Sequence, residues 1–139
     1  MDHIGPTVPP AALIALAGAL IGGAVALLIR AHTTFTAASR EFRATFADTL
    51  ARLRNTREDA FDILNRDFQR HELAVLEFAR HLTFRRKRFM AAWKQYTQGD
   101  QPRRFLERYS GKGHGVERTA ELRALAIRQL ESLLAFAAP

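Results

Sequence analysis

A run of nineteen residues without a charged or strongly polar side chain constrains this chain more than any other feature. It extends from Ala11 to Ile29 and reads AALIALAGALIGGAVALLI. At the helical rise of ~1.5 Å per residue it spans roughly 28 Å, about the thickness of the hydrocarbon core of a bilayer. A single segment in lipid can satisfy its backbone hydrogen bonds only as a helix. The sequence therefore predicts a transmembrane helix over residues 11–29.

The charges on the two sides of this run predict its orientation. The ten residues before it contain Asp2 and no lysine or arginine, whereas Arg30 is the first of three arginines by residue 43. Under the positive-inside rule, residues 1–10 are extracytoplasmic and residues 30–139 form a cytoplasmic domain. A cleaved signal peptide is the alternative. Its start would be basic, however, and the small-x-small motif at 24–26 lies inside the run rather than after it.

Beyond the run, apolar residues recur at helical spacing. The clearest pattern extends from Phe61 to Leu82 in alternating steps of three and four, as in a helix packed at a shallow angle against its neighbours. We expect an all-α fold, with one N-terminal transmembrane helix followed by a cytoplasmic bundle of three to four helices. The predicted core consists of Phe35, Phe42, Phe46, Phe61, Leu64, Phe68, Val75, Phe78, Leu82, Phe89, Trp93, Tyr96, Leu122, Leu130 and Leu133.

Capping and breaking residues predict where the helices begin and end. We expect the first helix to continue from the apolar run to about Asn55, with Thr56 capping the second. Thr83 is expected to cap a third helix over Phe84–Thr97. A last helix is predicted from about Val116 to Ala137.

One region holds the whole positive excess of the chain. Residues 80–112 contain ten basic and two acidic side chains, a net charge of +8 in a chain whose total is +7. An anionic partner is therefore expected to bind there, either anionic lipid headgroups, a phosphorylated small ligand or a protein. No nucleic-acid reading motif accompanies the charge. A solvated face that only fixes topology is the simplest alternative. The candidate binding residues are Arg85, Arg86, Lys87, Arg88, Lys94, Arg103, Arg104, Arg108 and Lys112.

Small residues within the apolar run predict self-association. Gly18 and Gly22 form a G-x-x-x-G pair, and Gly23 extends a second stripe of small residues beside it. Small side chains allow two helices to approach closely in lipid, so a homo-oligomer is expected. The alternative is that glycine is simply common in apolar helices.

Two polar features have both a structural and a functional interpretation. The segment SGKGHG at 110–115 could hold a phosphate with its backbone N–H groups, Lys112 and His114, but it lacks the Walker spacing, so we expect a flexible linker. His71 lies within an apolar pattern and is expected to be a core histidine or a pH-sensitive contact. His81 is ten residues away, which is the wrong spacing for a metal pair.

Catalysis has little support in the sequence. There is no cysteine, and Ser39, Ser110 and Ser132 lie in no hydrolase motif. We expect no catalytic residue, metal or cofactor, and interpret the chain as a non-enzymatic interaction or scaffold protein at the cytoplasmic membrane face. One alternative is a ligand-gated membrane effector of the defence or stress type, whose basic domain binds a phosphorylated or nucleotide signal. Another is a holin-like lysis protein.

Three stretches carry a resemblance to known sequences: EFRATF (Glu41–Phe46), RHELAVLEF (Arg70–Phe78) and RRKRFMAAWKQY (Arg85–Tyr96). Together with the N-terminal apolar run, they resemble uncharacterised small proteobacterial single-pass inner-membrane proteins with a cytosolic helical domain. The resemblance covers about the first two-thirds of the chain. It implies a bacterial origin and an inner-membrane location, and it implies no activity.

Overall fold

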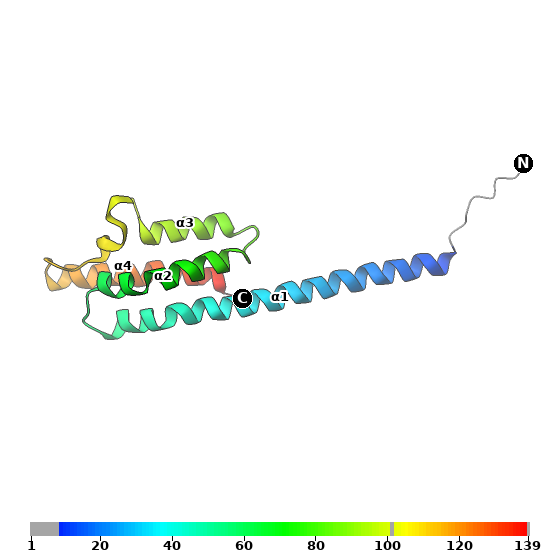
Figure 1. Cartoon of the computed structure of the whole chain (residues 1–139), viewed down its shortest axis with the longest axis horizontal. Coiled ribbons are helices and arrows are strands. Elements are labelled where there is room, and N and C mark those ends of the chain that lie inside the picture. Colours follow the sequence, from blue (N-terminus) through cyan, green and yellow to red (C-terminus); the bar gives the residue numbers. More distant parts are fainter. Residues whose placement is uncertain (1–8, 101, 139) are drawn as a thin grey trace, which may run out of the picture. The chain divides into compact units, whose positions relative to one another are not determined.

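A computed structural model describes residues 9–100 and 102–138, and within them the chain is helical, without a strand (Figure 1). The elements in chain order are α1 (Pro10–Asn55), α2 (Ala60–Ala79), α3 (Arg86–Thr97), the 3-10 helix η1 (Pro102–Tyr109), α4 (Val116–Leu134) and the short 3-10 helix η2 (Ala135–Ala137). The predicted all-α class is confirmed. The predicted continuation of the first helix beyond the apolar run, as far as Asn55, is also confirmed.

The described residues form two compact units, which divide after Phe35. In the first unit, the large apolar side chains of α1 that are described between residues 14 and 29 are exposed, for example Ile14 at 74% and Leu28 at 70%. By length and composition, α1 over Ile21–Asn55 is able to cross a membrane, although a signal sequence near an N-terminus has the same properties. An exposed apolar surface of this kind is typical of a segment that contacts a membrane or another protein.

The second unit contains the rest of α1 together with α2, α3 and α4 as a helical bundle (Figure 1). Aromatic rings join the helices at one end of this bundle. Phe42 of α1 stacks on Phe78 of α2 at 4.6 Å and meets the edge of Phe89 of α3 at 5.6 Å. Phe89 in turn lies 5.4 Å from Phe136, so the C-terminal segment closes the same cluster.

Most of the predicted core is buried, because the helical period decides which face each side chain takes. Three predicted members are corrected: Phe35, Phe61 and Phe68 are only half-buried. The ring of Phe68 packs on Trp93 and Phe105, away from the Phe42–Phe78–Phe89 cluster. The buried residues that the predicted core omits are Leu50, Leu53, Ala60, Ile63, Ala79, Leu106, Tyr109, Ala126 and Ala137.

Two predicted helix starts are wrong. Asp59, not Thr56, precedes α2, and the Thr56 hydroxyl instead donates back to the Arg52 carbonyl at 2.9 Å. The third helix begins at Arg86 rather than Phe84, and Thr83 caps nothing. Thr56 thus ends α1 with a hydrogen bond to the preceding turn instead of starting α2.

The link between α3 and α4 contains a sharp break. Helix α3 ends at Thr97, and Gly99 follows with φ +56°, where a Cβ would lie 2.0 Å from Nη1 of Arg108. Within η1 the backbone of Phe105 is non-helical, with φ 28°. This break allows Leu106 and Tyr109 to enter the core.

Candidate functional site

The four consecutive basic residues lie at the start of α3 and are exposed. Arg85 precedes the helix and places its guanidinium over the ring of Phe136 at 5.2 Å. Arg86, Lys87 and Arg88 form the first turn, which contains no acidic residue. A helix N-terminus carries partial positive charge and disfavours cations. The three basic side chains therefore interact unfavourably with the dipole of α3.

The later basic residues are not brought together with this turn. Arg108 is half-buried at the other end of α3, where its Nη2 donates to the carbonyls of Gln95 and Tyr96, the latter at 3.1 Å. Its guanidinium also lies over the Tyr109 ring at 4.7 Å. Since the last carbonyls of a helix lack partners within it, Arg108 closes the end of α3. About ten helical residues, or roughly 15 Å, separate it from Arg86.

The other predicted binding residues are dispersed. Lys94 is exposed two turns along α3. The side chains of Arg103 and Arg104 lie outside the described part of the chain.

Two buried tyrosines lie at the C-terminal end of α3. Burial raises the pKa of Tyr109, whose hydroxyl donates to the Tyr96 carbonyl at 2.7 Å, and it raises the pKa of Tyr96 as well. The C-terminal end of α3 is therefore closed by Arg108 and Tyr109, which donate hydrogen bonds to its backbone carbonyls.

Lys112 belongs to the loop at 110–115, beside an open hollow of about 460 Å³ lined by Phe61, Glu107, Ser110, Lys112 and His114. Its ammonium pairs with Asp62 at 2.9 Å, and this hydrogen bond raises the Lys112 pKa. Among the described residues that line the hollow, Lys112 is the one permanent cation; Asp62 neutralises it, while Glu107 adds a negative charge. A phosphate would meet no net positive charge there, so the hollow is poorly suited to an anion.

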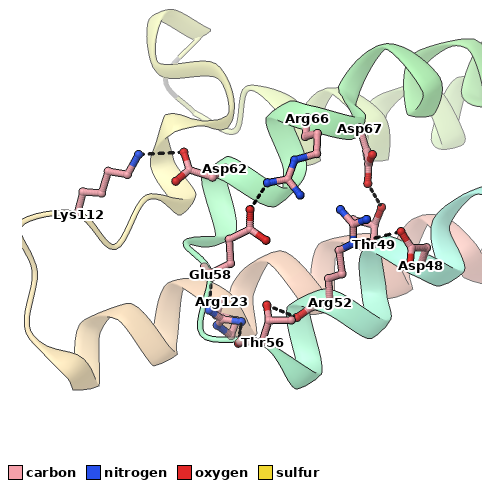
Figure 2. A network of polar contacts seen from close by, with 10 residues as sticks. All are labelled: Asp48, Thr49, Arg52, Thr56, Glu58, Asp62, Arg66, Asp67, Lys112 and Arg123. Atoms are coloured by element: carbon pink, nitrogen blue, oxygen red, sulfur yellow. Dashed lines mark hydrogen bonds and ion pairs between the residues drawn. The ribbon is translucent and has the colours of Figure 1, made fainter.

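Polar contacts fasten the turn between α1 and α2 (Figure 2). Arg123 of α4 donates from Nη1 to the carbonyls of Leu53 at 2.9 Å and Thr56 at 2.6 Å, and from Nη2 to the carbonyl of Glu58. The Glu58 carboxylate also pairs with Arg66. Sequence reasoning missed Arg123, because nothing local distinguishes one arginine on a helix from its neighbours.

The loop at 110–115 is fastened to the same turn from another side. The backbone N–H of Gly111 donates to Oδ1 of Asp59 at 2.6 Å, and the Asp59 side chain makes no capping hydrogen bond to α2. A Cβ on Gly111 would lie 2.5 Å from the Thr119 methyl group. The loop is therefore held at Gly111 rather than free along its whole length.

His71 is fully buried in a polar cluster between α1 and α2. The Thr49 hydroxyl donates to Oδ2 of Asp67 at 2.8 Å and lies 3.0 Å from Nε2 of His71. Because that hydroxyl has one proton, Nε2–H of a neutral imidazole is the donor to Thr49. The ring also stacks on Phe46 at 4.2 Å. Burial lowers the pKa of His71 to about 4; Asp67 opposes this shift and Arg70 adds to it.

The glycines of the apolar run have open space around them in the single chain. A Cβ built on Gly18, Gly22 or Gly23 meets no atom within 4 Å. Their side of α1 is therefore accessible to a second helix.

Among the described residues, no group of three or more His, Asp or Glu side chains is arranged to hold a metal ion. The functional candidate that sequence reasoning missed is Phe84, which is 98% exposed beside the basic turn. Its signal was available, because it is an apolar residue outside every predicted apolar stripe and next to four cations.

Comparison with known proteins finds no matching family model, no matching curated protein and no matching solved structure.

Proposed function

We propose that this chain is a non-enzymatic, single-pass membrane protein. Residues 11–29 anchor it, and the basic helical domain lies at the cytoplasmic face, with self-association through the face of Gly18, Gly22 and Gly23. The observation that carries the proposal is the exposure of the large apolar side chains described between residues 14 and 29 of α1, including Ile21 and Leu28. Lipid is the environment in which such a helix is stable.

The bundle supports a role in interaction rather than in ligand chemistry. Of its basic residues, Arg108 closes a helix and Lys112 pairs with Asp62, whereas those at the start of α3 remain on the surface. An unpaired cationic surface attracts partners of opposite charge.

A membrane-extraction experiment on the full chain tests the anchor. We expect the wild-type protein to stay in the membrane pellet at alkaline pH and to keep its full-length mass. Ile21→Arg places a charge near the middle of the run, at a cost of ~2.5–3.5 kcal/mol, and should release a large fraction of the protein. Leu73→Arg makes the same change at another exposed apolar residue, on α2, and should release none.

Two results would contradict the proposal. One is release of the wild-type chain with the soluble fraction. The other is a mature mass that begins after residue 26, which would identify the run as a signal peptide.

A further inference from the structure

The loop between α2 and α3, residues 80–85, presents an aromatic side chain directly to solvent. Phe84 is 98% exposed, more than any other large apolar side chain that the structure describes. Transfer of an exposed phenylalanine side chain from water to an apolar phase lowers its free energy. Aromatic residues are also favoured at the interface between water and lipid. Phe84 therefore has the properties of a residue that inserts shallowly into a membrane surface.

The cations beside Phe84 have no partner of opposite charge. Arg86, Lys87 and Arg88 form no ion pair with any residue in 9–100 or 102–138, although they occupy a helix turn that disfavours positive charge. At the opposite end of the bundle, Lys112 and Arg66 are each paired with a carboxylate. A surface that breaks a local rule without a compensating contact is expected at a functional site.

The loop lies at the end of the bundle from which α1 leads to the apolar run. Phe136, under the Arg85 guanidinium, lies 5.4 Å from Phe89, which lies 5.6 Å from Phe42. The loop is thus joined through adjacent rings to Phe42, in the first part of α1 that belongs to the bundle. Chain connectivity alone keeps Thr36 within roughly 25 Å of Ile29.

The charges at this end of the bundle favour an anionic surface. Its exposed cationic residues are Arg40, Arg43, Arg80, Arg85, Arg86, Lys87 and Arg88, and its exposed acidic residues are Glu41 and Glu77. Lysine and arginine side chains near an anionic leaflet attract it, and a tether to the same membrane raises the effective concentration of that surface.

We infer that the α2–α3 loop docks on the anionic membrane surface in which the chain is anchored. Phe84 enters the interfacial region, and Arg86, Lys87 and Arg88 lie among the headgroup phosphates. This inference rests on the proposed anchor at 11–29.

Spin labelling of the full chain in vesicles tests the docking. Since the chain has no cysteine, Thr83→Cys provides a single label site that leaves Phe84 in place. We expect the label to become accessible to dissolved oxygen and protected from an aqueous nickel complex in phosphatidylcholine vesicles with about 30 mol% phosphatidylglycerol. In phosphatidylcholine alone, the label should stay accessible to the nickel complex.

Matched labels and variants separate docking from general effects. Glu117→Cys places a label beside Val116, which is 90% exposed at the start of α4, and should remain accessible to the nickel complex in both vesicles. Arg86→Gln with Lys87→Gln should lower the ratio of docked to free loop about 30-fold, since each cation contributes about fivefold. Lys94→Gln with Arg128→Gln removes the same charge elsewhere and should change little. Phe84→Ser should reduce the immersion of the Thr83 label.

Flotation of the same vesicles distinguishes the two possible failures. If the chain floats but the Thr83 label stays as accessible to the nickel complex as the Glu117 label, docking is wrong and the anchor stands. If the chain does not float, the anchor is wrong and the docking inference falls with it. Protection from both reagents in neutral and anionic vesicles, with spin–spin broadening, would show that a second copy covers the loop and would overturn lipid docking.

Discussion

The two parts of α1 are both helical, but they differ in whether their apolar side chains are exposed or buried. Between residues 11 and 29 no position is charged, and the large apolar side chains with described exposure lie open. Between residues 36 and 55 charged residues alternate with a stripe that includes Phe42 and Phe46, and that stripe is buried. A helix with one polar face can bury its apolar stripe in a bundle, whereas a helix that is apolar on all sides is typical of a protein core or a membrane span.

The largest difference in the free energy of unfolding should be between substitutions of a buried and of an exposed phenylalanine. Phe46 is fully buried, 5.0 Å from Phe42, and Phe46→Ala should lower the free energy of unfolding by ~3–5 kcal/mol. Phe84→Ala should change it by less than ~0.5 kcal/mol. Urea titration in mild detergent, followed by fluorescence of Trp93, the one tryptophan of the chain, measures both. Equal effects would mean that the aromatic cluster is not the core.

Acid should weaken the bundle next most strongly, through His71. Its pKa is about 4 in the folded chain against 6.5 unperturbed, so between these values the unfolded chain binds more protons. The free energy of unfolding should therefore fall as the pH drops from 6.5 to about 4, by up to ~3 kcal/mol. The charged groups acting on the ring are Asp67 and Arg70.

Histidine variants isolate this pH effect. His71→Gln should flatten the dependence of the unfolding free energy on pH over that range. His81→Gln replaces an exposed histidine on the loop after α2 and should leave the pH dependence of the unfolding free energy unchanged. An unchanged slope in His71→Gln would assign the acid sensitivity to other groups.

Removing Arg123 should have an intermediate effect. Arg123→Met leaves the carbonyls of Leu53, Thr56 and Glu58 without their charged donor and should lower the free energy of unfolding by ~2 kcal/mol. Arg128→Met changes an exposed arginine on the same helix and should cost less than ~0.5 kcal/mol. The same urea titration compares the two variants. Indistinguishable midpoints would mean that Arg123 does not stabilise the turn between α1 and α2.

The smallest effect concerns the apolar part of α1 and should leave the bundle unchanged. A Cβ at Gly22 meets no atom of its own chain within 4 Å, so a loss of self-association in Gly22→Leu would indicate contact with a second helix. We expect it to weaken a dimer in micelles by roughly tenfold, as measured by analytical ultracentrifugation. Ala24→Leu enlarges a small residue on the opposite side of the helix and should not. Equal dimer affinity in both variants would exclude this glycine face as the contact.

The fold was predictable where the repeat of the helix decides the outcome. The spacing of Leu64, Val75 and Phe78 fixed their common face, and the structure buries all three. It could not show that Phe61 and Phe68 remain half-buried, because partial burial depends on how far neighbouring elements extend. The segment with Phe105, Leu106 and Tyr109 suggested one or two helical turns, but it is too short for its spacing to show that Leu106 and Tyr109 are buried.

The candidate site was less predictable because charge in a sequence carries no position in space. Ten basic residues within 80–112 suggested one patch, yet Arg108 and Lys112 have structural partners at the other end of α3 from Arg86. Such pairings depend on loops that dock only after the bundle forms. The run of Arg85–Arg88 was visible in the sequence, whereas the exposure of Phe84 depended on where α3 begins.

The most direct test of the account compares two positions on α1 by thiol accessibility in sealed vesicles. Ala19 and Ala47 are both exposed, and each can be replaced by the single cysteine of the chain. We predict that a membrane-impermeant maleimide labels Ala47→Cys from one side of the membrane and labels Ala19→Cys only after detergent is added. Equal labelling of Ala19→Cys and Ala47→Cys without detergent would contradict a membrane anchor at 11–29.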